Sequence, residues 1–327
     1  MASDLVDSAV GALLGTLVGD ALGMPGEGLS REELGATFGV LEGLVEGRLP
    51  AGEFTDDSEM TLSVAEALVA RGAFDQKEVA KVLAENFTPW RGYSPHVYGI
   101  MARIRQGFSW AIPGVSHFSS DAAVRCAPLA VLYADDPELV DHAVKLAEIT
   151  DLHPNGLAGA VLQSLSVSWA VVNGLFESSI DRDDLLERLH RPVSDQSVAM
   201  SDAVSRLRDV QVPRDPRGLP AAIGRVYPCD GGAVTTVPAA LAAFVYTTSF
   251  ESAVVTAVNC GGDTDTLGAM TGALAGAFYG ASSIPERLLT GLANEKRGRD
   301  FARELGRKLG ELTRQRSGKR LEFDDLE

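Results

Sequence analysis

Two short stretches of the sequence hold more oxygen-bearing side chains than helix capping requires. They read FTDDSEM and NCGGDTDTLG, and their candidate ligands are Thr55, Asp56, Asp57, Asp263, Asp265 and Thr266. One aspartate or threonine is enough to cap a helix. Acids brought together raise one another's pKa, and a divalent cation removes their repulsion. A shared metal site is therefore favoured over two separate helix caps.

The donor types decide which metal would fit. Oxygen ligands from aspartate, glutamate and threonine suit Mg²⁺, Mn²⁺ or Ca²⁺ rather than zinc. Five or six such ligands are enough for two ions, and two metals bridged by a carboxylate could orient vicinal hydroxyl groups and activate water. A third acidic stretch, GDALGMPGEG, adds Asp20 and Glu27 to the candidates.

All three acidic stretches lie at the ends of expected helices. Apolar residues from Val10 to Ala21 recur every three or four positions, which is typical of an amphipathic helix. The same period recurs in segments that begin near Ser58, Asp141, Gly156, Val237 and Thr266. Alternating strand patterns are scarce, so the sequence predicts an all-α fold with long loops.

Glycine recurs every fourth residue in the first and the last of these helices. The two ridges consist of Gly11, Gly15, Gly19 and Gly23, and of Gly268, Gly272, Gly276 and Gly280. Glycine inside a helix costs about 1 kcal/mol relative to alanine, and close backbone approach would offset that cost. We expect each ridge to pack tightly on another core helix, with packing of the two ridges on each other as one arrangement.

Composition limits the classes of protein that this chain can belong to. Its 327 residues are 45% hydrophobic and 23% charged, and no linker divides them, so we expect one domain over residues 1–327 with a charged tail from about residue 312. The net charge of -16 repels phosphate, so nucleic acid is not expected as a general partner.

Localisation is predicted from several features that the sequence lacks. The first residues show neither a basic region nor a cleavage pattern, and no apolar run reaches membrane-spanning length without a charge or a turn residue. The three cysteines, Cys126, Cys229 and Cys260, form no CxxC motif and predict neither a zinc site nor disulfides. We therefore expect a cytoplasmic protein with buried thiols and no membrane partner.

The motifs, taken together and in order, resemble the ADP-ribosylglycohydrolase family. The strongest matches are GALLGTLVGDALGMPGEG, FTDDSEMTLSVAEAL and NCGGDTDTLGAMTGALAGAFYG, and the similarity runs from about Gly11 to Pro285. Weaker matches are RGYS from Arg91, AAVRCAPLA from Ala122, TDLHP from Thr150 and TTVPAALAAF from Thr235.

The resemblance implies a compact orthogonal bundle of helices with a binuclear Mg²⁺ or Mn²⁺ centre in a cleft. The six candidate ligands named above would hold the metals, with Asp265 as the bridge. The catalytic residues would be Glu27, Asp56 and Asp265, with Glu27 near both metals and the scissile bond. The residues that bind substrate would be Gly92, Tyr93, Ser119, Ser120, Asp121, His153, Gly261 and Gly262.

The reaction implied is hydrolysis at C1″ of the distal ribose of an ADP-ribosyl conjugate, with release of ADP-ribose. The substrate could be a protein carrying ADP-ribosyl-arginine or ADP-ribosyl-serine, O-acetyl-ADP-ribose, or an ADP-ribosylated nucleic-acid end, and we expect a monomer. Donors to the diphosphate would be backbone N–H groups of the NCGGD loop together with Ser119 and Ser120.

The chain departs from the family pattern at two places. Ser119, Ser120 and Asp121 replace a loop rich in glycine and asparagine, and Asp151 stands where many relatives have histidine. The metal centre is complete, so the identity of the substrate is the more open question.

Other classes of function share parts of the pattern. DDSEM is similar to the DDxxD motif of all-α terpene cyclases, but Met60 replaces its last acid. DTDTL is similar to the nucleophile loop of haloacid-dehalogenase phosphatases, but Leu267 misses the final position. A non-catalytic, crystallin-like or ligand-binding relative and a hydrolase of another ribosylated small molecule are further alternatives.

Overall fold

The computed structural model describes residues 4–109, 118–174, 176 and 179–324. Within these residues the secondary structure is helical, and the pairing of Ser119 with Gly232 is an isolated β-bridge outside any strand. The α-helices are α1 Leu5–Gly23, α2 Arg31–Phe38, α3 Asp56–Arg71, α4 Gln76–Asn86, α5 Pro95–Arg105, α6 Asp121–Val124, α7 Ala127–Leu132, α8 Leu139–Ala147, α9 Pro154–Gly174, α10 Arg182–Gln196, α11 Val198–Ser205, α12 Leu219–Val226, α13 Ala233–Val245, α14 Phe250–Val258, α15 Thr264–Tyr279, α16 Glu286–Gly291 and α17 Arg299–Asp324. The predicted all-α fold is confirmed.

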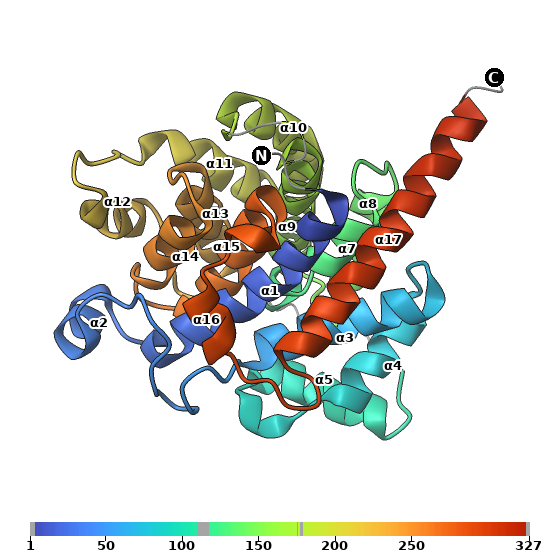
Figure 1. Cartoon of the computed structure of the whole chain (residues 1–327), viewed down its shortest axis with the longest axis horizontal. Helices are drawn as coiled ribbons and strands as arrows, with labels where there is room; N and C mark the ends of the chain where they lie inside the picture. The colour runs from blue at the N-terminus through green and yellow to red at the C-terminus, as the bar shows by residue number, and fades with distance from the viewer. Residues whose placement is uncertain (1–3, 110–117, 175, 177–178, 325–327) are drawn as a thin grey trace.

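Helix α1 lies at the centre of the molecule and packs along α15 (Figure 1). Every residue of α1 from Ser8 to Gly23 is buried. The facing glycine pairs are Gly11 with Gly276, Gly15 with Gly272, and Gly19 with Gly268. A Cβ atom on any of these glycines would overlap the carbonyl group of the opposite one. The predicted packing of the two glycine ridges on each other is confirmed.

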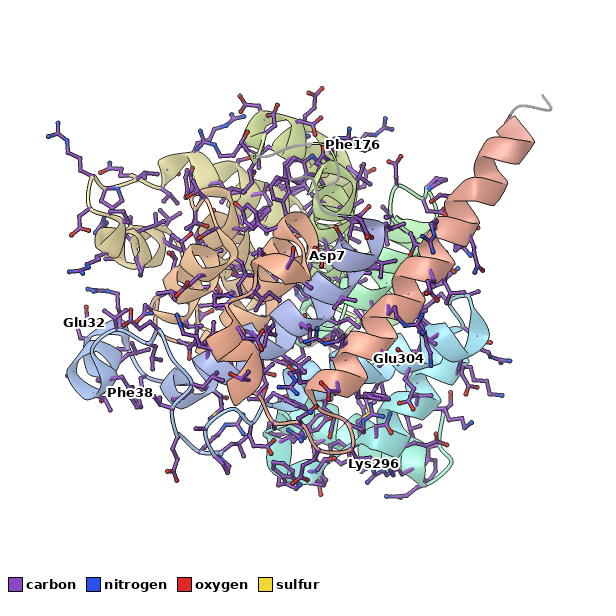
Figure 2. The ribbon with its side chains drawn as sticks, in the orientation of Figure 1. Asp7, Glu32, Phe38, Phe176, Lys296 and Glu304 are labelled. Carbon is purple, nitrogen blue, oxygen red and sulfur yellow. The ribbon has the colours of Figure 1, made fainter. Side chains whose placement is uncertain are left out.

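The remaining helices surround this central pair. Helix α17 crosses α1, α3 and α7, and its last turns, which include the predicted charged tail, extend beyond the other helices (Figure 1). Lys296 lies just before α17 and Glu304 on it, and both are at the outer surface (Figure 2). One hydrophobic cluster runs from Ala9 to Leu309. The single-domain organisation stays a prediction from the sequence.

Two helices are long and apolar enough to span a membrane by length and composition alone. They are Leu5–Gly26, with a mean hydropathy of 1.5, and Pro154–Gly174, with a mean hydropathy of 1.2. In the structure, 83% and 78% of their most apolar windows are buried inside the protein. Buried core helices of soluble proteins pass the same test, so these two helices are weak indicators of a membrane.

Candidate active site in an acidic cleft

The predicted site residues gather in one cavity of about 730 Å³, the acidic cleft. Eleven of them line it: Glu27, Asp56, Asp57, Gly92, Tyr93, Ser119, Asp121, Gly262, Asp263, Asp265 and Thr266. The cleft therefore unites loops that the sequence keeps far apart.

At the N-terminus of α3, other residues cap the helix, so its two aspartates are not needed as caps. Thr55 is the N-cap, and its hydroxyl accepts a hydrogen bond from the Asp57 N–H at 3.2 Å. Asp20, buried at the end of α1, accepts bonds from the N–H groups of Thr55 and Ser58 and from the Ser58 hydroxyl at 2.6 Å. The carboxylates of Asp56 and Asp57 are thus left to face the cleft.

The N-terminus of α15 meets that of α3 across the cleft. The Thr266 hydroxyl donates a hydrogen bond to Asp57 Oδ2 at 2.9 Å, which joins residues 209 positions apart. Asp263 accepts a bond from the buried Ser120 hydroxyl at 3.1 Å, and its N–H donates to the Cys229 carbonyl at 2.9 Å. The two acidic motifs therefore form one site.

Glycine shapes the loop before α15. Gly261 and Gly262 have φ angles of 83° and 78°, in the left-handed region that favours glycine. A Cβ atom on Gly262 would overlap the Cys229 carbonyl group. The Gly262 N–H donates to the Leu29 carbonyl at 2.7 Å, so it is not free for a phosphate as the sequence suggested. Gly262 serves as a close wall of the cleft instead.

Four predicted site residues do not line the cleft. Thr55 and Ser120 are buried behind it, where they hold α3 and Asp263 in place. Gly261 packs against the backbone of Arg31 and lines a neighbouring cavity. The His153 ring lies 5.6 Å from the ring of Phe118, which lines the cleft, and its Nδ1 accepts a hydrogen bond from the Asn155 N–H.

Burial makes the acids of the cleft hard to ionise. It raises the pKa of Asp56, Asp57 and Asp265 well above the ordinary value, and repulsion from neighbouring carboxylates adds to the effect. Burial also raises the pKa of Asp20 and Asp263 to about 6, against the opposing effect of their hydrogen bonds. A bound cation would offset this cost.

Oxygen donors of the cleft fit Mg²⁺ or Mn²⁺. The carboxylates of Asp56, Asp57 and Asp265 are buried, and that of Asp57 is repelled by the neighbouring carboxylate of Asp263. The Thr266 hydroxyl completes an all-oxygen set in the cleft, and the Thr55 hydroxyl lies behind it. Among the described residues, no three acidic, histidine or cysteine side chains already converge as a formed metal cluster. The fit therefore rests on donor chemistry and burial.

Sequence patterns did not indicate Arg48, which lies beside the cleft, or Asp230, which lines it. Arg48 contacts Glu27 Oε2 through Nε at 2.7 Å and lies 3.6 Å from Asp265 Oδ2 through Nη2. Its Nη1 also donates to the Arg91 carbonyl at 2.8 Å. No local pattern marks Arg48, because its partners come from distant segments of the chain. Asp230 and its two glycines also line the cleft, and the acid beside a glycine pair in CDGG could have been noticed.

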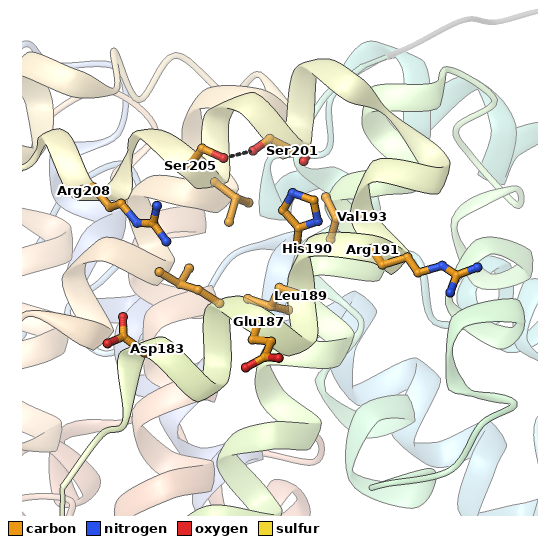
Figure 3. A pocket seen from close by; sticks show the side chains of 11 residues that line it. Asp183, Glu187, Leu189, His190, Arg191, Val193, Ser201, Ser205 and Arg208 are labelled. Carbon is orange, nitrogen blue, oxygen red and sulfur yellow. Dashed lines mark hydrogen bonds between the residues drawn. The ribbon is translucent and has the colours of Figure 1, made fainter.

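A second cavity, of about 520 Å³, lies between α10 and α11 (Figure 3). His190 and Arg208 point toward it, and along its edge the Ser205 hydroxyl donates to the Ser201 carbonyl at 3.0 Å. Its acids, Asp183 and Glu187, lie on α10 without a facing acidic cluster. It lacks the convergent carboxylates that distinguish the acidic cleft.

Comparison with protein families and curated proteins agrees with the geometry. The sequence profile described as ADP-ribosylglycohydrolase matches residues 1–319. An uncharacterized protein of Archaeoglobus fulgidus is 30% identical over 92% of this chain and 95% of its own length. The ADP-ribosyl dinitrogen reductase glycohydrolase of Rhodospirillum rubrum is 28% identical over 88% and 90%, and ADP-ribosylhydrolase ARH3 of Gallus gallus is 27% identical over 84% and 86%.

A solved structure shares the fold. It is described as an ADP-ribosylglycohydrolase-related protein complex and superposes with a TM-score of 0.74 at 29% sequence identity. The superposition covers 95% of this chain and 99% of the solved one. The similarity thus extends over the helices that carry all three acidic motifs.

Proposed function

Because the chain belongs to the ADP-ribosylglycohydrolase family, whose members include glycosidic-bond hydrolases, we propose that it cleaves the bond at C1″ of an ADP-ribosyl conjugate and releases ADP-ribose. The conjugate would be a protein bearing ADP-ribosyl-arginine or ADP-ribosyl-serine, or a related ADP-ribosyl compound. The observation that carries the proposal is the meeting of the acidic ends of α3 and α15 beside Glu27 in one cleft.

We propose that two Mg²⁺ or Mn²⁺ ions are the cofactors. Their ligands would be Thr55, Asp56, Asp57, Asp263, Asp265 and Thr266, with Asp265 shared between them. When bound, such ions neutralise the carboxylates, orient the ribose hydroxyls and lower the pKa of water. Asp20 does not face the cleft, and its role is to hold the start of α3 in register for the ligands.

We propose that Glu27 accepts the proton of the attacking water and that this proton passes to the leaving group as the bond at C1″ breaks. Its carboxylate lines the cleft and is held at 2.7 Å by Arg48, which itself is tied to the Arg91 carbonyl. The ion pair fixes the orientation of the carboxylate, and a defined orientation is the first requirement of a general base. The buried aspartates around it favour the positive charge that develops on the ribose as the glycosidic bond breaks.

The side of the cleft that Tyr93 and Phe118 line suits the adenosine part of the substrate. Tyr93 and Phe118 supply aromatic surface there, and the Ser119 hydroxyl is available as a donor. Asp121, which accepts a hydrogen bond from Ser94 at 2.8 Å, adds a negative charge that also acts on Asp56 and Asp263.

A second candidate is a hydrolase of a ribosylated small molecule without a diphosphate. Seven acids and neither lysine nor arginine occur among the described residues that line the cleft. Such a lining repels a diphosphate, whereas the metal ligands would bind a ribose with or without one. As further proposals from the sequence, the protein acts as a cytoplasmic monomer, with nucleic acid as a partner only when ADP-ribosylated.

The first test is release of free ADP-ribose. The purified protein is incubated with Mg²⁺ or Mn²⁺ and with ADP-ribosylated arginine, serine and nucleic-acid-end substrates, alongside EDTA controls. We expect metal-dependent release from one linkage, and a loss of about 1000-fold or more in kcat for Asp265→Asn, because a bridging charge is removed.

Two results would contradict the proposal. Near-normal turnover by Asp265→Asn would show that Asp265 does not bridge metals. If calorimetry finds two bound ions while no substrate yields ADP-ribose, the second candidate replaces the first, and ribosylated compounds that lack a diphosphate become the substrates to screen.

A further inference from the structure

A third cavity lies beside the acidic cleft, between the start of α2 and the end of α12. We call this cavity of about 480 Å³ the shoulder cavity. It shares Gly28, Asp230 and Gly262 with the cleft, so the two cavities adjoin at these residues. Two basic side chains, Arg31 and Arg225, line the shoulder cavity and are absent from the cleft.

The position of the shoulder cavity relative to Glu27 indicates which part of a conjugate would enter it. Glu27 precedes Gly28, which forms part of the wall between cleft and shoulder. In the proposed function the ribose lies at the carboxylates, and the adenosine lies toward Tyr93 and Phe118. The group attached at C1″ then extends past Glu27, in the direction of the shoulder cavity.

The shoulder cavity has an unsatisfied positive charge. Arg225 is exposed in the last turn of α12, and no described residue forms a hydrogen bond or ion pair with it. Arg31 pairs with Glu32 at 2.9 Å, but both side chains are largely exposed, at 45% and 75%, so the pair is weak. Glu32 lies in the first turn of α2 and also lines the shoulder cavity (Figure 2).

Besides Glu32, the acid that lines the shoulder cavity is Asp230, and its carboxylate already accepts hydrogen bonds from its own loop and the start of α13. Asp230 accepts hydrogen bonds from the Thr235 hydroxyl at 2.5 Å and from the Gly232 N–H at 3.2 Å. These bonds lower the pKa of Asp230, and they hold its carboxylate toward the start of α13 rather than toward the two arginines.

The backbone that carries Arg31 is fixed. Ser30 and Glu33 form a capping box at the start of α2, and Gly261 leaves room only for the Arg31 backbone beside it. The Gly28 N–H donates to the Gly262 carbonyl at 2.8 Å, which ties the shoulder to the loop that carries Asp263. The Arg31 backbone is thereby held at a constant position relative to the loop that carries Asp263.

We propose that the shoulder cavity is the subsite for the leaving group and that Arg31 and Arg225 select a protein segment with an acidic residue beside the modified one. This inference rests on the proposed function. A peptide is favoured over nucleic acid because the net charge of -16 repels a polyanion beyond the cavity, whereas one carboxylate needs only the local arginines.

The test uses two fluorescent ADP-ribosylated peptides that differ only in having glutamate or glutamine next to the modified residue. Binding to the full-length protein is measured by anisotropy in EDTA, and ADP-ribose release is then measured after Mg²⁺ is added. Variants are Arg31→Gln, Arg225→Gln, their double variant and, as a matched control, Arg191→Gln, whose side chain is 91% exposed on α10.

We expect the wild-type protein to bind the glutamate peptide about fivefold more tightly than the glutamine peptide. The ratio should fall to about one in the double variant and persist in Arg191→Gln. Arg225→Glu should reverse the preference, which a merely destabilised variant would not do.

Equal affinity for the two peptides in the wild type, or a preference that survives the double variant, would overturn the inference. Tighter binding of an ADP-ribosylated, phosphorylated oligonucleotide through the same arginines would replace the peptide with a nucleic-acid end. Charge-dependent binding without release of ADP-ribose would refute the proposed function but support peptide binding at the shoulder cavity. Release of ADP-ribose without a preference for the glutamate peptide would support the proposed function and refute the role of the shoulder cavity.

Discussion

Asp20 illustrates how a single buried carboxylate supports the site without facing the substrate. It accepts hydrogen bonds from two backbone N–H groups and one hydroxyl at the start of α3, and no solvent reaches it. The cleft depends on these hydrogen bonds, because Asp20 fixes the backbone of the segment that carries Thr55, Asp56 and Asp57.

Removal of the Asp20 carboxylate should lower both stability and metal affinity. In Asp20→Ala three buried donors lose their acceptor, which costs about 3 kcal/mol in the free energy of unfolding. Chemical denaturation measures this loss, and calorimetry should show metal binding weakened by at least about tenfold. Asp181→Ala, which removes an exposed N-cap on α10, is the control and should leave metal affinity unchanged. Unaltered metal affinity in Asp20→Ala would show that α3 holds its register without Asp20.

At the residue scale, the sequence predicted the candidate metal ligands better than the residues around them. The acidic motifs stood out because capping alone did not explain them, and the structure brings them together. Arg48 could not be predicted in the same way, because it lies in a loop whose path depends on contacts with segments far along the chain. Asp230 was marked only by the glycine pair that follows it.

At the scale of elements, the two glycine ridges allow α1 and α15 to pack backbone to backbone. A larger side chain on either ridge must push the helices apart. Gly15→Leu and Gly272→Leu should each lower the free energy of unfolding by about 3 kcal/mol or more. Thermal or chemical denaturation measures the change.

Gly35 offers a matched control for this prediction. It lies in helix α2, but a Cβ atom there would meet no atom within 4 Å. Gly35→Leu should therefore be neutral or stabilise the protein by about 0.5–1 kcal/mol through helix propensity. Equal effects of leucine at Gly15 and Gly35 would refute close packing of the ridges.

Helices were the most predictable elements of this chain. The spacing of apolar residues and the glycine period contained the information for α1 and α15, including their mutual packing. The loops between Phe38 and Thr55, and between Val226 and Ala233, carry no such period. Their conformation is set by contacts with α15 and with one another, so it could not be predicted from the local sequence.

At the scale of the whole molecule, the buried acids link metal binding to stability and pH. Asp20 and Asp263 have a folded-state pKa of about 6 against an ordinary value of 3.8. Between these values the folded chain binds protons that the unfolded chain does not. The free energy of unfolding attributable to these groups therefore rises as pH falls from about 6 to about 4.

The metal should reverse this dependence, because a bound cation keeps the carboxylates charged and is released when they are protonated. In EDTA we expect the melting temperature to change less, or to rise, between about pH 7 and about pH 5. With saturating Mg²⁺ it should start higher and fall over the same range. Identical profiles with and without metal, measured by calorimetry, would contradict a metal site among these acids.

The pairing of α1 with α15 also has a consequence for biosynthesis. The facing glycines are about 250 residues apart, and ribosomes add roughly 5–20 residues per second, so α1 is complete roughly 12–50 s before its partner exists. During that interval the nascent chain carries an apolar helix that meets the length and hydropathy of a membrane span. Chaperones that shield this helix from aggregation and from the membrane-insertion machinery would then govern how much of the protein reaches its native state.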